Sequence, residues 1–111
     1  MKRKFRLVRS DDFQRVRREG VSYAHPFAIL LIAENVTNSP RVGISVNRAI
    51  GNAVKRNRVK RQIRAIINEI LPNIKKNCDA VIIVRPTIQK AEYTEIKNAM
   101  VKLFDRTGLL K

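Results

Sequence analysis

Residues 52–71 read NAVKRNRVKRQIRAIINEIL, and this stretch determines most of the predicted fold and chemistry. Its apolar positions recur at helical spacing, which predicts one long helix with a buried stripe. The positions of this stripe are Val59, Ile63, Ile66, Ile67 and Ile70. Pro72 follows directly and is expected to end the helix. Extended toward the amino terminus, the stripe meets polar residues. The last three turns are therefore predicted to pack on a core, and the first two turns are predicted to face solvent or a charged partner.

The first half of this predicted helix is strongly basic. The ten residues from Lys55 to Arg64 carry six positive charges and no negative one, and no acidic residue occurs between Gly51 and Asn68. A helix amino terminus favours Asp or Glu, by up to about 1 kcal/mol each, so folding alone would not select this pattern. A bound polyanion would be stabilised there by the helix dipole, the free N–H groups and the guanidinium groups. An ordinary solvated helix face is the alternative, but such a face normally mixes both signs of charge.

The composition favours a folded protein that binds nucleic acid. The chain has 111 residues, enough for one domain with a modest core, and 44% of them are hydrophobic, unlike a disordered basic tail. A net charge of +15 and a pI near 11.2 are typical of nucleic-acid binders. Anionic membrane is the rival partner, but no apolar run approaches the roughly 20 residues that span a bilayer. The basic segment from Met1 to Arg9 also lacks a following signal-type apolar stretch. We therefore expect a cytoplasmic protein with no membrane partner.

The rest of the chain predicts a small mixed sheet with helices packed on it. Residues 1–9 are expected to form a loosely held, flexible basic arm, followed by a short helix over about 11–19 with Ser10 as N-cap and Gly20 as C′ residue. The three predicted strands are residues 27–33, 41–46 and 80–84. A last helix begins near Tyr93 and is closed by Gly108, and its core positions include Tyr93, Met100 and Phe104. The order α-β-β-α-β-α predicts a single α/β (α+β) domain over residues 1–111.

Within the predicted strand 41–46, Val42 and Ile44 share one face, whereas Arg41, Gly43 and Ser45 share the other. This second face is small and polar, which can let another molecule approach the backbone.

Two residue types occur only once. Cys78 cannot form an intramolecular disulfide and is expected to be a structural, half-buried thiol at the start of a strand. His25 has no cysteine partners with which to build a zinc site, so it is expected in a loop or at the start of a strand.

The segment Ile50-Gly51-Asn52-Ala53-Val54-Lys55-Arg56-Asn57-Arg58-Val59-Lys60-Arg61 resembles the signature of the bacterial ribonuclease P protein family, including its Arg-Asn-Arg core. The resemblance extends over roughly residues 3 to 107. It includes Asp12 to Val16 with Gly20 in the first helix, Arg41 to Val46 in the strand before the basic helix, and Ala80 to Arg85 in the strand after it.

The resemblance implies a fold and a role. The implied fold is a compact two-layer sandwich with a left-handed β-α-β crossover, although about 98% of such connections are right-handed. The implied role is that of the protein subunit of a ribonucleoprotein that removes the 5′ leader from precursor tRNA. In that family the catalytic RNA and its Mg²⁺ ions perform the hydrolysis. The protein binds this RNA and guides the leader through a cleft between the sheet and the first helix. We expect the protein to hold no cofactor itself and to be monomeric alone.

The resemblance also implies individual site residues. RNA contacts are assigned to the basic helix, at Arg56, Asn57, Arg58, Lys60, Arg61 and Arg64, and Lys55 joins them by its charge. The leader cleft is assigned Phe13 and, more weakly, Ser22 and Ser45. Where the family often has an aromatic residue one turn after Phe13, this chain has Arg17, and Leu31 replaces a strand aromatic. An Arg plane can stack on a base, so leader recognition is expected to be less aromatic and more electrostatic.

Two other classes of function compete with this interpretation. A stand-alone, ribosomal-type RNA-binding protein would have the same charge, and the RNA that co-purifies with the protein would distinguish it. An autonomous nuclease is disfavoured because the sequence shows no catalytic triad, paired carboxylates or metal-ligand cluster. Asp11 and Asp12 are better explained by capping of the first helix. No residue of the chain is therefore predicted to be catalytic or to bind a metal.

Overall fold

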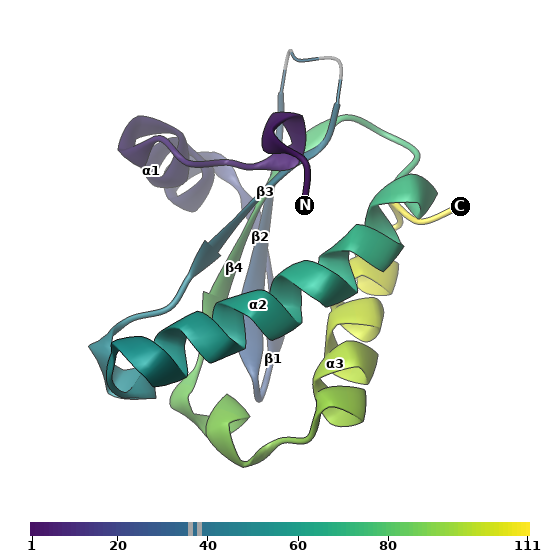
Figure 1. The fold of residues 1–111 in the computed structure, drawn as a ribbon. Helices are drawn as coiled ribbons and strands as arrows, with labels where there is room; N and C mark the ends of the chain where they lie inside the picture. Colours follow the sequence, from purple (N-terminus) through teal and green to yellow (C-terminus); the bar gives the residue numbers. More distant parts are fainter. Residues whose placement is uncertain (36, 38) are drawn as a thin grey trace.

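A computed structural model describes residues 1–35, 37 and 39–111. The helices are α1 (Ser10–Glu19), α2 (Ala53–Ile70) and α3 (Tyr93–Arg106). The strands are β1 (Val21–His25), β2 (Ala28–Glu34), β3 (Arg41–Ser45) and β4 (Cys78–Val84). Short 3₁₀ helices are η1 (Arg3–Phe5), η2 (Arg48–Ile50), η3 (Leu71–Asn73) and η4 (Pro86–Lys90). Figure 1 shows α2 and α3 on one face of the sheet and α1 on the other.

The four strands form one mixed sheet in the order β1-β2-β4-β3. Strand β2 pairs antiparallel with β1 and β4, whereas β3 pairs parallel with β4 through the crossover helix α2. The predicted mixed α/β class is confirmed, and the handedness of the crossover stays a prediction. The predicted element order lacked β1. This strand is hard to predict because it lies at the sheet edge, pairs with β2 alone, has no buried position and lacks a clear alternation of polar and apolar side chains.

The main core lies between the sheet and the two helices α2 and α3. The stripe of α2 enters this core as predicted, and Ile63, Ile66 and Ile67 are completely buried. From α3, Met100 and Phe104 join them, whereas Tyr93 is 39% exposed and does not. The prediction of Tyr93 as a core residue is therefore wrong, because it is the first residue of α3 and precedes the turns that pack. The last turns of α2 lie beside α3, and its first turns extend away from it (Figure 1).

The start of α2 is fixed by side-chain amides. The Asn52 Oδ1 atom accepts a hydrogen bond from the Lys55 backbone N–H at 3.0 Å, and Asn47 caps η2 by accepting from the Ala49 N–H at 3.0 Å. Between the two caps, Gly51 has a φ of +132°, a conformation that other residues rarely adopt. The predicted helix boundaries are correct to within one residue at each end.

Helix α1 differs from the prediction at both ends. Ser10 is its first residue and Arg9 is the N-cap, without a side-chain capping bond, so the prediction of Ser10 as N-cap is wrong. Asp11 and Asp12 in the first turn complement the helix dipole instead. Gly20 does follow the helix, but its φ is −75°, so it does not adopt the left-handed conformation of a C′ glycine. A Cβ atom there would lie 2.4 Å from the Val16 carbonyl oxygen, and this close approach requires glycine.

The amino-terminal segment is not the loosely held arm that we predicted. Leu7 is only 3% exposed, and its backbone N–H donates to the Val42 carbonyl at 3.0 Å. Arg6 forms an isolated parallel bridge with Val42. The physical reason is that β3 is an edge strand, whose outer backbone groups need partners, and Arg6 and Leu7 supply them at Val42. We call residues 1–9 the N-terminal arm below.

Cys78 starts β4 as predicted, but its thiol is buried rather than half-buried. Burial, reinforced by the charge of Asp79, raises its pKa to about 11. His25 ends β1, and its Nδ1 atom accepts a hydrogen bond from the Phe27 N–H at 3.1 Å in a hairpin whose loop is Pro26 and Phe27. Burial and the nearby charges of Lys102, Arg106 and Arg85 lower the pKa of His25.

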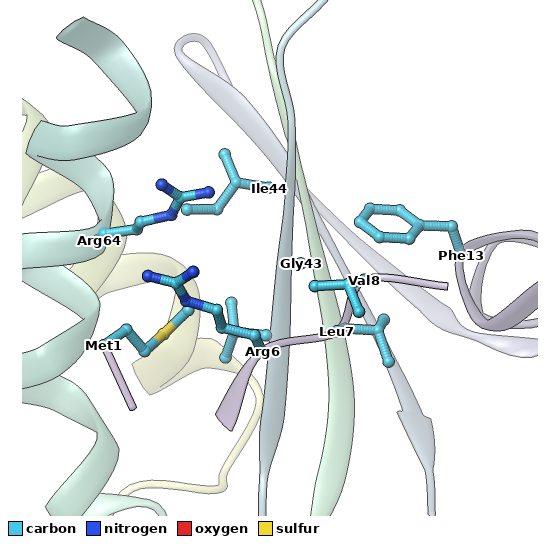
Figure 2. Close-up of a pocket in the computed structure, with 9 residues that line it drawn as sticks. Met1, Arg6, Leu7, Val8, Phe13, Gly43, Ile44 and Arg64 are labelled. Atoms are coloured by element: carbon cyan, nitrogen blue, oxygen red, sulfur yellow. The ribbon is translucent and has the colours of Figure 1, made fainter. Parts of the chain in front are cut away.

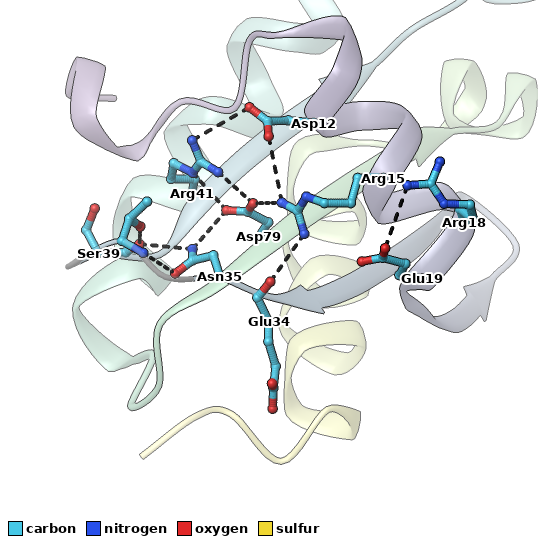
Figure 3. A network of polar contacts seen from close by, with 10 residues as sticks. Asp12, Arg15, Arg18, Glu19, Glu34, Asn35, Ser39, Arg41 and Asp79 are labelled. Atoms are coloured by element: carbon cyan, nitrogen blue, oxygen red, sulfur yellow. Dashed lines mark hydrogen bonds and ion pairs between the residues drawn. The ribbon is translucent and has the colours of Figure 1, made fainter.

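Asp79 is the one buried charged residue among those described, with an exposed fraction of 0%. Figure 3 shows it at the centre of a network of polar contacts. Arg41 binds it in a bidentate manner, with Nε and Nη2 at 2.8 and 2.7 Å from the two carboxylate oxygens. Asn35 donates to the same carboxylate at 2.8 Å, and Arg15 of α1 makes a further close contact. Asp12 lies 3.8 Å from Arg15 and 3.7 Å from Arg41. We call these five residues the Asp79 cluster.

The Asp79 cluster makes stability depend on acid pH. Burial alone would raise the pKa of Asp79, but hydrogen bonds from Arg41 and Asn35 and the charges of Arg41 and Arg15 lower it below 3.8. The stabilisation is therefore fully present above that value and is lost as the pH falls through the lower folded-state pKa. We expect Asp79→Asn to reduce the free energy of unfolding by about 3–5 kcal/mol near neutral pH. Urea unfolding between about pH 7 and about pH 3 should show this difference shrinking toward acid; a constant difference would contradict it.

The two halves of α2 should respond differently to truncation. Ile63→Ala removes a completely buried side chain and is expected to cost about 2–5 kcal/mol of unfolding free energy. Arg56→Ala combined with Asn57→Ala changes the half of the helix that lies before the stripe and should leave the melting temperature nearly intact. Thermal melts of the three proteins test this division. Equal destabilisation of the double variant and Ile63→Ala would show that the first half of α2 also supports the core.

Candidate nucleic-acid interface

The basic half of α2 presents its charges to solvent. Lys55, Asn57, Arg58 and Arg61 are exposed, and Arg56, Lys60 and Arg64 are half-buried. The ion pairs found among the described residues involve other side chains, so these six cations have no acidic partner there. Like charges held this close on one helix repel one another, and a bound anion would relieve that repulsion.

The helix divides the predicted RNA-binding residues between two surfaces. Lys60 and Arg61 lie three and four residues after Asn57, and Arg64 lies four and three residues after them, so the four side chains share one helix face. They line an open hollow of about 440 Å³. On the opposite side of the helix, Lys55 and Arg58 line a separate groove of about 220 Å³ against Ile88 and Gln89. The structure therefore does not bring all seven predicted residues together. The surface through Asn57 and Arg64 is the one that continues toward the sheet.

That continuation includes a residue that the sequence analysis missed. Arg6 of the N-terminal arm and Arg64 of α2 direct their guanidinium groups into the same pocket of about 190 Å³ (Figure 2). The edge of β3 at Gly43 and Ile44 forms part of its wall, and no acidic side chain lines it. Two guanidinium groups with no lining carboxylate form a favourable site for a phosphate. The signal in the sequence was the alternation of Phe5, Arg6 and Leu7, which is typical of a short extended segment that packs on one side.

The other side of β3 carries the residues predicted for the leader cleft. Phe13 of α1 packs directly over Gly43, where a Cβ atom would lie 2.4 Å from the ring. The small face of β3 is thus filled by the chain's own aromatic ring at this position, and not left free for another molecule. Arg17, one turn later, donates from Nη2 to Ser45 Oγ at 3.3 Å. The structure therefore brings Phe13, Arg17 and Ser45 together.

Ser22 lies on the same sheet face but at its far edge. Strand register aligns Ser22 with Leu31, Leu31 with Val81 and Val81 with Gly43, so two strands separate Ser22 from β3. Leu31 is buried beneath α1 in a small core with Val16 and Val81. The next row along the strands contains Ile29 and Ile83, which are only half-buried. The surface formed by Phe13, Arg17, Ser22, Ser45, Ile29 and Ile83 is called the open sheet face below.

Within the described ranges, no three His, Cys, Asp or Glu side chains gather where they could hold a metal ion. Among the described helices, none has an apolar stretch of the length needed to cross a bilayer.

Comparison with known proteins gives a consistent result over almost the whole chain. The family model described as Ribonuclease P matches residues 1–108. The chain is 37% identical over 110 residues to the ribonuclease P protein component of Bacillus cereus (strain B4264), covering 98% of this chain and 96% of that protein. It is 38% identical to the corresponding protein of Bacillus anthracis (strain CDC 684 / NRRL 3495), covering 98% of this chain and 92% of that protein.

Solved structures agree with the sequence relatives. The ribonuclease P protein of Staphylococcus aureus superposes with a TM-score of 0.89 at 28% identity, covering 96% of this chain and 98% of that chain. The ribonuclease P protein of Thermotoga maritima superposes with a TM-score of 0.83 at 28% identity, covering 91% of this chain and 96% of that chain. Together, the match to the family model, the sequence identity and the shared fold show that this chain belongs to the ribonuclease P protein family.

Proposed function

We propose that this chain, as the protein subunit of ribonuclease P, binds the catalytic RNA through α2 and the 5′ leader of precursor tRNA on the open sheet face. In this proposal the RNA subunit carries out the hydrolysis. One observation carries the proposal. The surface formed by the basic side chains of α2, which have no acidic partner among the described residues, continues through the pocket shared by Arg6 and Arg64. It reaches the edge of β3 beside Phe13. A folded RNA and a single strand emerging from it could therefore be held side by side.

The α2 surface suits a structured RNA backbone. Lys60, Arg61 and Arg64 present three cations along one helix face, and Arg6 adds a fourth from the N-terminal arm. Arg–phosphate contacts are among the strongest charge-assisted hydrogen bonds, and they need no particular base sequence. Asn57 lies among these cations and supplies an amide that both donates and accepts. This surface would therefore position an RNA more than read its sequence.

The open sheet face suits a single strand. Half-buried Ile29 and Ile83 offer apolar surface, while Phe13 and Arg17 stand beside it on α1. Single-stranded nucleic acid is generally held by flat groups that stack on bases and by cations that contact the backbone. Arg17 can supply both, because its guanidinium plane stacks and carries charge. This supports the expectation that leader binding here is more electrostatic than aromatic.

The acidic residues near this surface already have partners. The Asp79 carboxylate is occupied by Arg41, Arg15 and Asn35, and Asp12 lies beside the two arginines. A carboxylate held by two guanidinium groups is poorly placed to act as a base or to bind Mg²⁺. We accordingly propose that the chain contributes no catalytic group and that Mg²⁺ enters with the RNA subunit. We further propose that the protein is monomeric without RNA and acts in the cytoplasm.

A stand-alone RNA-binding protein remains the second candidate, because the basic surface alone would serve it equally well. The family match over residues 1–108 favours the ribonuclease P role.

Reconstitution tests the proposed role directly. The purified protein, freed of RNA, should not cleave precursor tRNA with or without Mg²⁺. Added to a bacterial ribonuclease P RNA at low Mg²⁺, it should increase the rate at which mature 5′ ends form. The charge of +15 makes non-specific RNA annealing a concern, so an equally basic unrelated protein serves as control. Cleavage by the RNA-free protein, or equal stimulation by the control protein, would refute the proposal.

The salt dependence of RNA binding tests the assigned contacts, including Arg6. If Arg6 and Lys60 each contact a phosphate, Arg6→Ala and Lys60→Ala should each weaken binding. Each should also reduce the slope of log affinity against log salt by about one unit. Lys75→Ala removes the same charge from an exposed position after the end of α2 and serves as matched control. Filter binding at several salt concentrations measures the slopes. A slope for Arg6→Ala that matches Lys75→Ala would exclude Arg6 from the interface.

A further inference from the structure

Helix α1 is attached to the sheet by few contacts. Of its ten residues only Val16 is buried, and Phe13 is partly buried over Gly43. Asp12 lies 3.7 Å from Arg41 of β3, and Arg17 donates to Ser45 at 3.3 Å. The strongest polar attachment is Arg15, whose Nη2 atom contacts the Asp79 carboxylate and whose Nη1 atom donates to the Glu34 carbonyl at 3.2 Å. The helix that carries Phe13 and Arg17 therefore depends on a charged anchor as well as on packing.

The anchor lies between the two residues that α1 contributes to the open sheet face. Arg15 is two positions after Phe13 and two before Arg17, on the side of the helix that faces Asp79 (Figure 3). Because a helix moves as a rigid unit over one turn, a shift of α1 at Arg15 would displace both neighbours. Such a shift would change the distance between the Arg17 guanidinium and Ser45, and it would change how the Phe13 ring packs on Gly43.

The cluster is built so that this anchor can be removed without unfolding the sheet. Arg41 and Asn35 together make three hydrogen bonds to Asp79 that do not involve α1. Loss of Arg15 would therefore leave the buried carboxylate paired within the sheet and turn, whereas α1 would lose its charged link to β4 and keep only the apolar packing of Val16 on Val81. The side chain of Arg15 is 27% exposed, so its replacement does not open a large cavity.

We propose that Arg15, held by Asp79, is a positioning residue that fixes α1 over the sheet and thereby sets the geometry in which Phe13 and Arg17 receive a single-stranded leader. The inference rests on the proposed function of the open sheet face. It assigns Arg15 no direct contact with RNA. Its role is to keep the two α1 residues at a fixed height above Ser45, Ile29 and Ile83, so that a strand enters a preformed surface.

The test compares two substrates in the reconstituted holoenzyme: precursor tRNA with its full leader, and the same precursor with its leader trimmed to a single nucleotide. Arg15→Met keeps the apolar stem and removes the charge. We expect it to raise KM for the full-leader substrate by about tenfold, in the range of couplings between linked sites, with kcat at saturation unchanged. The trimmed substrate should show wild-type KM and kcat. Arg15→Lys, which can make a single contact with Asp79, should restore part of the loss.

Controls separate this role from simple destabilisation. Asp105→Asn changes an exposed charge on α3 and should behave as wild type with both substrates. If Arg15 only supported the fold, Arg15→Met would reduce kcat for both substrates in parallel with a loss of folded protein, measured by circular dichroism. That result, or an unchanged preference for the full leader, would overturn the proposal. A wild-type protein that gives no advantage to the full-leader substrate would instead refute the proposed leader-binding function itself.

Discussion

The buried carboxylate of Asp79 determines how the elements around the open sheet face come together. A charge withdrawn from water is costly unless hydrogen bonds and opposite charges replace its hydration. Here β4 supplies the carboxylate, β3 supplies Arg41, the segment after β2 supplies Asn35 and α1 supplies Arg15. Four separate parts of the chain must therefore reach one point before the charge is satisfied. Apolar packing alone, with Val16 as the one buried residue of α1, would define the position of that helix less strictly.

The same cluster shapes the distribution of charge over the whole molecule. Two of the 9 acidic residues, Asp12 and Asp79, are used to hold arginines of α1 and β3. No acidic residue occurs between Glu34 and Glu69, a stretch that includes β3 and the basic half of α2. Negative charge is therefore placed where the fold needs an internal partner and is absent from the surface that is proposed to bind a polyanion.

Sequence reasoning succeeded where one local pattern decided the outcome. The stripe of α2, Asn52 at its start and the apolar runs of β2 and β4 were predictable because each signal lies within a single element. It failed where the decisive partner is distant in sequence. Leu7 is ordered because β3 has a free edge, Gly43 is small because Phe13 lies on it, and Asp79 is buried because Arg15 and Arg41 meet there. The site followed the same rule: the basic residues of α2 were visible, and Arg6 beside Arg64 was not.

The amide cap of α2 carries a further consequence. An aspartate at position 52 could accept the same hydrogen bond from Lys55 and would add a favourable interaction with the helix dipole. It would also place a negative charge at the end of the helix that is proposed to contact RNA. Asn52 makes the capping bond without cancelling the field of the first turn, and Asn47 does the same for η2. Helix stability and affinity for a polyanion compete for this single position, and its occupant is the residue that leaves the field intact.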